Sequence, residues 1–248
     1  MTLAFGKKLA EGKTKIIFAH LTDPTLVYMA HKDTISAGDG ARRNAILGKG
    51  ALSCRTTSNV FRALERAGLP THFVDQPSDN IMLVRGCRMI LLEVVMRRIA
   101  TGSYLKRNPD IHEGTRFDPP VVEFFIKDDA RHDPIIAAED IPGATLASPE
   151  EVEGMIQLGR RAFEVLEEAW ARQDVTLVDM KIEFGRDFDC NLLIADVIDN
   201  DSWRLWPGAQ REKMLDKQIY REMKQVDEDS LARLKEKYEQ VADMSERL

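Results

Sequence analysis

The chain has 248 residues, of which 44% are hydrophobic and 31% are charged, so it can bury a sizeable core and is not expected to be disordered. Its formal net charge of -6 argues against a general affinity for nucleic acid or anionic membranes, and no apolar run is long enough to span a bilayer. Three widely spaced cysteines without a CxxC pair, and an N-terminus unlike a signal peptide, predict a cytoplasmic protein with neither a disulfide framework nor a zinc site.

The first third of the chain is predicted to be rich in β-strands. Short apolar runs favour strands, in chain order, at residues 15–19, 25–30, 81–84 and 89–96. Residues 36–40 have the composition of a loop. Residues 51–67 have the apolar spacing of a helix, which Gly68 and Pro70 would end.

The rest of the chain is predicted to carry most of the helices. Prolines recur between residues 109 and 147, where one strand is expected at 121–126. A capping box at Ser148-Pro-Glu-Glu151 begins a long helix, two apolar strands follow at 176–184 and 192–198, and amphipathic helices end the chain. This order predicts an α+β fold with two lobes: an antiparallel-sheet lobe at residues 1–90 and a mixed α/β lobe at residues 91–248.

The strand at residues 176–184 has the most informative pattern. Side chains alternate between the faces of a strand, so Asp179, Lys181 and Glu183 share one face, and the other face is apolar. The next apolar run carries Asp196 at its centre. Charges in buried strands are costly unless they are paired or bind a metal, so these residues are a candidate metal and phosphate site. The alternative is a structural ion pair of Lys181 with Asp179 or Glu183.

The register between these two strands decides whether their carboxylates meet. Only pairings whose residue numbers sum to an odd value place Glu183 and Asp196 on one face. The sequence leaves the register open. Joint binding of a metal by the two residues therefore predicts an odd sum.

The segment Glu11-Gly-Lys-Thr-Lys15 resembles the end of a phosphate-binding P-loop. The earlier glycine, Gly6, leaves five intervening residues where the motif needs four, and the residues that follow open a strand, whereas the motif opens a helix. We therefore reject a P-loop. A glycine-containing β-turn that places Lys13 and Lys15 over phosphates remains open, and so does a solvated lysine-rich turn.

Two further polar segments follow apolar strands. Gly102-Ser103 can begin a short helix whose N–H groups accept an anion, and Arg97 can bind the same anion through two parallel hydrogen bonds. The alternative is a basic surface turn. His132 and Asp133 lie in a polar loop, where adjacent side chains point apart, so a solvated loop is favoured over a catalytic pair.

Taken in order, these segments resemble the phosphoribosylaminoimidazole-succinocarboxamide synthase (SAICAR synthetase) family of purine biosynthesis, from Glu11 to about Trp206. The blocks that carry the resemblance are EGKTK (11–15), SAGDGAR (36–42), GKG (48–50), AGLPTHFV (67–74), LEVVMRRIATGSYLKR (92–107), HDP (132–134), LVDMKIEFG (177–185) and the strand that ends at Asp196. The segment from Ser202 to Trp206 also matches.

The resemblance implies a two-lobed fold, kinase-like or ATP-grasp-like in outline, in which residues 1–90 cover ATP. It also implies a ligase that joins 5-amino-1-(5-phosphoribosyl)imidazole-4-carboxylate (CAIR) to L-aspartate, through an acyl phosphate, with ATP and Mg2+ as cofactors. Its partners would be these small molecules and other copies of the chain in a homo-oligomer, without nucleic acid or membrane. A small-molecule kinase and a catalytically silent nucleotide-binding module remain the alternatives.

The resemblance also implies roles for single residues. Catalysis would involve Lys13, Asp179 and Lys181. ATP would contact Lys13, Lys15, Glu93 and Lys181. CAIR would contact Ser36, Gly38, Asp39, Arg97, Ser103, Asp133 and Arg204. The magnesium ligands would be Glu183 and Asp196.

Overall fold

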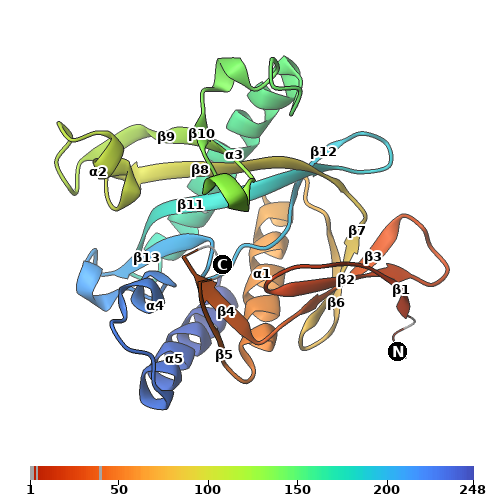
Figure 1. The fold of residues 1–248 in the computed structure, drawn as a ribbon, viewed down its shortest axis with the longest axis horizontal. Coiled ribbons are helices and arrows are strands. Elements are labelled where there is room, and N and C mark those ends of the chain that lie inside the picture. The colour runs from red at the N-terminus through yellow and green to blue at the C-terminus, as the bar shows by residue number, and fades with distance from the viewer. Residues whose placement is uncertain (1–2, 4, 39–40) are drawn as a thin grey trace.

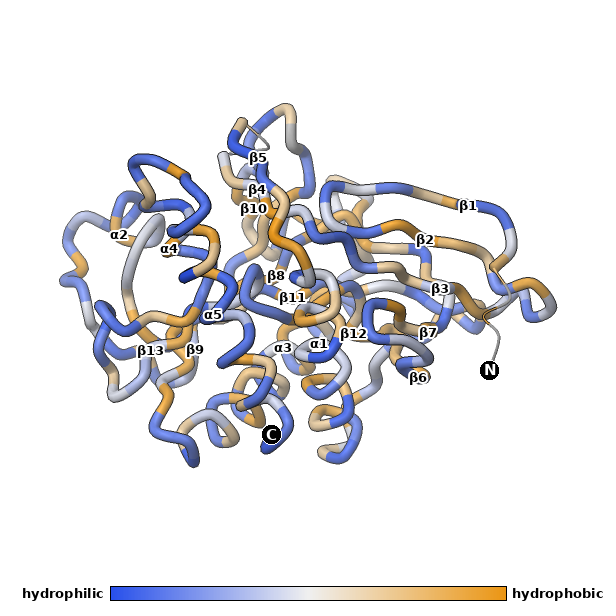
Figure 2. Tube along the Cα trace, turned by 90° about the horizontal axis from the view of Figure 1, so that it is seen from below, coloured by the Kyte–Doolittle hydropathy of each residue, from blue (hydrophilic) through white to orange (hydrophobic). Residues whose placement is uncertain are grey.

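The computed structural model describes residues 3, 5–38 and 41–248, and these form an α+β fold of antiparallel sheets and helices (Figure 1). Figure 2 shows hydrophobic segments concentrated towards the middle of the molecule, where α1, α3, β8 and β11 lie, and hydrophilic segments in the outer loops. The predicted fold class is confirmed. None of the described helices is long and apolar enough to cross a membrane.

The first sheet is built from the N-terminal part of the chain. Its strands, in spatial order, are β1 (Phe5–Glu11), β2 (Lys15–His20), β3 (Leu26–His31), β7 (Ile81–Arg85) and β6 (Phe73–Ser78). The strands predicted at 15–19, 25–30 and 81–84 are confirmed. The sequence did not reveal β1 or β6, because β1 is mostly exposed and carries three charged residues and β6 contains a proline. Helix α1 (Lys49–Arg66) packs on this sheet through Phe61.

The second sheet forms the centre of the molecule. Its spatial order is β10 (Ile135–Ile136), β9 (Arg116–Ile126), β8 (Arg88–Ile99), β11 (Val175–Arg186) and β12 (Leu192–Ala195), and β13 (Trp203–Pro207) also pairs with β11. Helix α3 (Pro149–Ala171) packs against β8 and β11. Its predicted capping box is confirmed, since Ser148 accepts from the Glu151 N–H and the Glu151 carboxylate accepts from the Ser148 N–H.

A small hairpin in the N-terminal part of the chain packs against the C-terminal helices. The hairpin consists of β4 (Thr34–Ala37) and β5 (Arg42–Ala45), so part of the loop predicted at residues 36–40 is strand. Ile35 and Ile46 pack with Tyr220, Leu234 and Tyr238 in a second core. These aromatic and leucine side chains come from α4 (Gln218–Glu222) and α5 (Glu228–Ser245). The lobe boundary near residue 90 and the kinase-like outline remain predictions.

Short helical segments lie in the remaining connections. They are α2 (Ser103–Arg107) and the 3-10 helices η1 (Asp129–Arg131), η2 (Ala138–Asp140) and η3 (Arg211–Lys213). The helix start predicted at Ser103 is therefore confirmed.

Candidate active site

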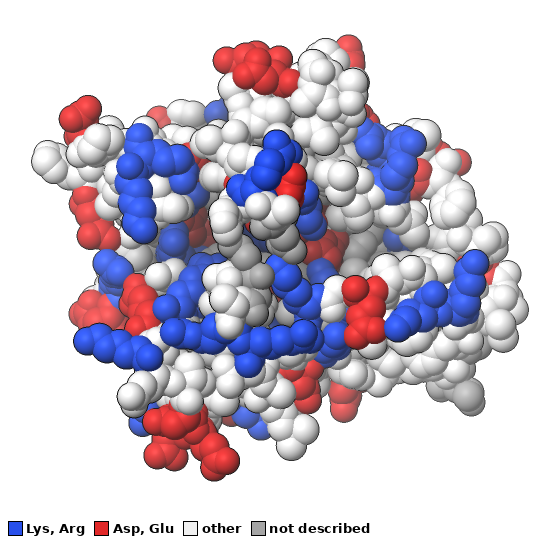
Figure 3. All heavy atoms as spheres, in the orientation of Figure 1, with Lys and Arg blue, Asp and Glu red and all other residues white. Residues whose placement is uncertain are grey.

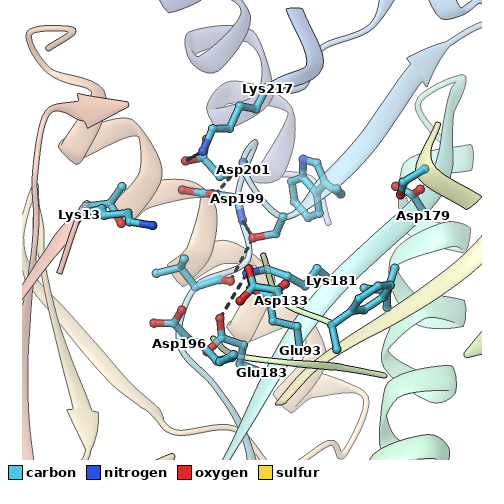
Figure 4. A pocket seen from close by; sticks show the side chains of 18 of the residues that line it. Lys13, Glu93, Asp133, Asp179, Lys181, Glu183, Asp196, Asp199, Asp201 and Lys217 are labelled. Atoms are coloured by element: carbon cyan, nitrogen blue, oxygen red, sulfur yellow. Dashed lines mark hydrogen bonds and ion pairs between the residues drawn. The ribbon is translucent and has the colours of Figure 1, made fainter. Parts of the chain in front are cut away.

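A cavity of about 960 Å³ lies against the charged face of β11. It is bounded by the β1–β2 turn, by β8 and β11, by the connection from β12 to β13 and by α4. Figure 3 shows a hollow in the middle of this face of the molecule, with Lys and Arg around it and acidic side chains recessed within. Figure 4 shows the labelled residues that line the cavity from several sides.

The alternation predicted for β11 is confirmed. Asp179, Lys181 and Glu183 line the cavity, whereas Met180 and Ile182 are fully buried in the core on the other face. On the neighbouring strand β8, Arg97 lies opposite Asp179 and Glu93 lies opposite Glu183. The sheet therefore carries two adjacent rows of charged side chains into one cavity.

One end of these rows, which we call the lysine end, is a cluster of lysines and carboxylates. Lys181 Nζ lies 2.6 Å from Glu93 Oε1 and 3.2 Å from Glu183 Oε1, and Lys127 also pairs with Glu183. Burial by itself would lower the pKa of Lys181, but the carboxylates of Glu183 and Glu93 raise it above the ordinary value for lysine. Lys181 therefore stays charged in the cavity.

Asp196 reaches the same cluster by a route that the sequence did not reveal. Glu183 lies opposite Ala195, an even sum, so the predicted odd-sum register is wrong. Strand β12 ends at Ala195, and Asp196 adopts a left-handed backbone conformation with φ of 64°. The alternation rule does not apply beyond the end of the strand, and Asp196 lines the cavity together with Glu183 (Figure 4).

Two contacts hold Asp196 in this position. Its carboxylate pairs with Lys15, which projects from β2 in the other sheet. His72 Nε2 donates to its backbone carbonyl oxygen over 3.1 Å. Burial would raise the pKa of Asp196, but Lys15, Lys127 and Lys181 bring it well below the ordinary value. Asp196 is therefore ionised and can accept a cation.

The other end of the cavity, which we call the arginine end, is a network of arginines and carboxylates. Arg97 Nε donates to Glu123 over 2.5 Å and Arg97 Nη1 donates to Asp179 over 2.8 Å. Arg204 also pairs with Asp179, and Arg107 donates to Glu123 over 2.6 Å. Arg97 is only 4% exposed, so the network fixes the orientation of its guanidinium group. The sequence revealed neither Arg107 nor Glu123, although Glu123 interrupts an apolar run in β9.

Gly102 lets α2 approach this network. Its φ is 60°, and a Cβ atom built there would lie 2.7 Å from Arg204 Nη2. Ser103 follows and lines the cavity. Helix α2 has only five residues, so the guanidinium groups supply most of the positive charge at this end.

The remaining predicted residues are distributed around the cavity. Lys13 is exposed in the turn between β1 and β2 and lines the cavity, as do Ser36 on β4 and Asp133. The segment after Lys13 is a strand, as the rejection of a P-loop required. Gly38, with φ of 59°, is not among the lining residues, and Asp39 lies outside the described residues.

The acidic residues of the cavity do not form a complete set of metal ligands by themselves. Within the described part of the chain, no group of three or more His, Cys, Asp or Glu side chains is placed to hold a metal ion. Glu183 and Asp196 nevertheless face the same cavity. Two carboxylates suit Mg2+, which commonly takes one or two protein carboxylates and completes its shell with phosphate oxygens and waters.

The fold and the cavity are those of a protein with one large cavity lined by both basic and acidic side chains. The family model of SAICAR synthetase matches residues 8–242. The phosphoribosylaminoimidazole-succinocarboxamide synthase of Roseiflexus sp. (strain RS-1) is 62% identical, over 96% of this chain and 95% of that protein. The crystal structure of the Ehrlichia chaffeensis synthase covers 98% of this chain and 99% of its own, with a TM-score of 0.87 and 33% identity.

A SAICAR synthetase solved in complex with ADP is also similar. It has a TM-score of 0.85 and 30% identity, and the match covers 95% of this chain and 96% of that one. The chain belongs to the SAICAR synthetase family. The family resemblance found in the sequence is therefore confirmed.

Proposed function

We propose that this protein joins CAIR to L-aspartate at the expense of ATP. The arginine end of the cavity would bind CAIR, and the lysine end would bind ATP. The observation that carries the proposal is the single cavity with an arginine network at one end and lysines with two acidic side chains at the other. A family relative binds ADP, which supports use of ATP.

The arginine end suits the 5′-phosphate of CAIR. Arg97, Ser103 and Arg204 converge there, and guanidinium groups bind phosphate oxygens in pairs. From Asp179 to Glu183 the strand advances four residues, or about 13 Å at the usual rise. A phosphoribosyl group attached to an imidazole can bridge that span, which brings the carboxylate of CAIR beside Lys181. Ser36 and Asp133 would border the same substrate.

The lysine end suits the phosphates of ATP. Lys13 and Lys15 extend from the first sheet over the cavity. Glu183 and Asp196 would hold Mg2+, which when bound offsets the negative charge of the phosphates. Lys15, Lys127 and Lys181 now pair with these carboxylates, so the cluster already accommodates positive charge at this position.

The two ends together explain why ATP is needed. A carboxylate is a poor acyl donor, because oxide would have to leave. An oxygen of the CAIR carboxylate attacks the γ-phosphorus, the bond to ADP breaks, and an acyl phosphate forms. The amine of L-aspartate then forms the amide bond, phosphate leaves, and the nitrogen releases its extra protons.

Charge and proximity supply the catalysis in this scheme. Lys181, fixed between Glu93 and Glu183, stabilises negative charge on the acyl phosphate. Alignment of the reactants can contribute roughly 7–11 kcal/mol in well-oriented cases. No covalent nucleophile of the protein is required.

The test is a coupled assay of ADP release in which ATP, Mg2+, CAIR and L-aspartate are omitted one at a time. We expect ADP only when all four are present, with SAICAR formed in equal amount. Steady ADP release without L-aspartate would favour a small-molecule kinase. Binding of ATP without turnover would favour a silent nucleotide-binding module.

A further inference from the structure

Residues 67–74 lie outside the cavity and have no part in the function proposed above. They connect α1 to β6, and on the way they pair with β12 of the second sheet. The Ile194 N–H donates to the Pro70 carbonyl over 3.0 Å, and the His72 N–H donates to the Ile194 carbonyl over 2.9 Å. Thr71 and Ile194 form a parallel bridge, while the opposite edge of β12 pairs with β11. The segment that leads into the first sheet therefore also holds a strand of the second.

The side chain of His72 extends this contact beyond the end of β12. Its Nε2 donates to the backbone carbonyl of Asp196 over 3.1 Å, so Nε2 carries the proton of the ring. The imidazole is 2% exposed, and its centroid lies 5.2 Å from that of Phe61, with the two rings edge to face. The Arg85 N–H donates to the His72 carbonyl over 2.7 Å. The donor is therefore held in place by the fold itself.

The residue that receives this hydrogen bond has a strained backbone. Asp196 has φ of 64°, a conformation that costs free energy in any residue with a side chain and persists only where the surroundings support it. Its side chain is short, so the direction of the backbone decides where the carboxylate lies. This conformation brings the carboxylate into the cavity with Glu183. The bond from His72 supports it directly.

The two contacts of Asp196 differ in how they would respond to a metal ion. Lys15 pairs with the carboxylate, which is the group that would bind Mg2+, so the lysine and the metal compete for it. His72 contacts the backbone carbonyl, and this bond is compatible with a cation on the carboxylate. When Lys15 moves to a phosphate, the bond from His72 still holds Asp196 in place.

We infer that His72 is a positioning residue for magnesium: its Nε2–H keeps Asp196 in the conformation in which the carboxylate meets Glu183, before and after the metal binds. The inference rests on the proposed function, in which these two carboxylates hold Mg2+. It makes the metal-dependent part of ATP binding depend on a buried residue that does not line the cavity. Residues that orient metal ligands from outside the ligand shell commonly change metal affinity about 10- to 100-fold.

The experiment measures the Kd of ATP by calorimetry in Mg2+ and in EDTA, without CAIR or L-aspartate. In the unaltered protein, Mg2+ should strengthen ATP binding by a measurable factor. In His72→Leu this factor should fall on the order of 10-fold, the lower end of the usual range, because His72 acts through the backbone. The Kd in EDTA should stay within about twofold, since the lysines of the cavity are unchanged.

A conservative variant tests whether the donor itself is responsible. In His72→Gln the amide Nε2 is as many bonds from the backbone as the imidazole Nε2 and can donate to the same carbonyl. We expect this variant to keep the Mg2+ factor of the unaltered protein. A purely structural role for His72 would not move the Mg2+ factor in either variant.

The matched control for loss of stability is Thr71→Val on the same segment. Thr71 is 1% exposed, and its hydroxyl donates to Glu65 over 2.8 Å and accepts from the Phe73 N–H over 3.1 Å. Valine has the same shape but loses both hydrogen bonds. Thr71→Val should lower the free energy of unfolding and leave the Mg2+ factor unchanged.

Each of the remaining outcomes decides the question. An unchanged Mg2+ factor in His72→Leu, or an equal fall in Thr71→Val, would overturn the inference. If His72→Leu does not fold, His72→Asn replaces it, because the asparagine amide is one bond shorter than glutamine and does not reach the carbonyl. Equal Mg2+ factors in His72→Asn and His72→Gln would then overturn the inference. If Mg2+ does not strengthen ATP binding in the unaltered protein, the proposed metal site itself is wrong, whereas a normal Mg2+ effect with unaffected His72 variants overturns only this inference.

Discussion

The two ends of the cavity hold opposite charges together in different ways. At the arginine end, Arg97, Asp179 and Glu123 all come from neighbouring strands of one sheet, and Arg97 is bonded to both carboxylates. At the lysine end, Lys15 comes from the first sheet, and its partner Asp196 lies just beyond the end of β12. One end is built within a sheet, and the other is assembled from separate parts of the fold.

This difference indicates different behaviour on ligand binding. A guanidinium group has a planar set of donors, so Arg97 can keep its two carboxylate partners and still present an N–H edge to a phosphate. A lysine is a point charge on a flexible chain. We therefore expect the ion pairs of the arginine end to persist when CAIR binds. The pairs of Lys15 and Lys127 should exchange carboxylates for phosphate as ATP and Mg2+ enter.

The largest effect is expected from Glu183→Gln at the lysine end. The substitution keeps the shape of the side chain but removes a charge that pairs with Lys127 and Lys181 and would hold Mg2+. ADP release should fall roughly 100- to 1,000-fold, as when one preorganised electrostatic contact is lost. The measurement is the coupled ADP assay across a range of Mg2+ concentrations.

Two observations check this prediction. Glu168→Gln is the control, because Glu168 is exposed on α3 and pairs with Arg172 at the surface. It should leave ADP release unchanged. If Glu183→Gln retains full turnover and an unchanged Mg2+ requirement, then Glu183 belongs to a structural ion pair, and the lysine end is not a metal site.

A smaller effect is expected from Arg97→Lys at the arginine end. The ammonium group cannot bridge two carboxylates and a phosphate, so the KM for CAIR should rise on the order of 10- to 100-fold. The KM for ATP should change little. Arg97→Ala should raise the KM for CAIR further and also destabilise the fold, because Glu123 and Asp179 would each keep only one arginine.

The neighbouring arginine provides the control for loss of stability. Arg98 lies on the opposite face of β8 and donates to Glu167 through two nitrogens at 2.7 Å, away from the cavity. Arg98→Lys should lower the melting temperature without raising the KM for CAIR. A rise in the KM for ATP but not for CAIR in Arg97→Lys would show that the two ends are assigned the wrong way round.

A further, milder effect is expected from Lys13→Ala. Lys13 is exposed in the β1–β2 turn, so its removal should not change the melting temperature. A charge-assisted phosphate contact contributes about 1.5–3 kcal/mol when it is buried, and solvent weakens it at an exposed position, so the KM for ATP should rise by less than about tenfold. Lys8→Ala, an exposed residue on β1 outside the cavity, is the control. Equal ATP kinetics in both variants would mean that the turn is only a solvated lysine cluster.

The sequence predicted the features of the site that depend on local rules. Alternation placed Asp179, Lys181 and Glu183 on one face of β11, and the capping box placed the start of α3. Gly102 and Ser103 marked the start of α2. Each of these follows from spacing within a few residues, which is the range over which sequence patterns act.

Features that depend on distant partners could not be predicted. The register of β11 with β12 gave an even sum, and Asp196 reached the cavity through a left-handed residue that no periodicity indicates. The contacts of Glu123 with Arg97 and Arg107 arise because β8 pairs with β9, and Lys217 reaches the cavity only after α4 packs beside the hairpin. Charged pairs formed between elements leave no local signal.

The acid stability of the protein should depend on His72, whose substitution by glutamine should have the smallest effect on turnover at neutral pH. His72 is 2% exposed and supports the lysine end through its hydrogen bond to Asp196. Burial lowers the pKa of His72 to about 4, whereas an unfolded chain binds this proton near 6.5. As the pH falls from about 6.5 to 4, the unfolded chain therefore binds a proton that the folded protein does not bind. The free energy of unfolding falls by up to about 3 kcal/mol in this window.

The measurement is urea unfolding at several pH values between 7.5 and 4 for the unaltered protein and for His72→Gln. His31 has a pKa lowered to about 3 by burial, so it contributes with the same sign and remains in both proteins. His72→Gln should reduce the slope of unfolding free energy against pH in this window, because one proton-binding difference is removed. Glutamine can still donate to the Asp196 carbonyl, so turnover at pH 7.5 should be largely kept. An identical slope in the two proteins would mean that His72 binds its proton equally in the folded and unfolded states, and that the acid lability of the lysine end arises elsewhere.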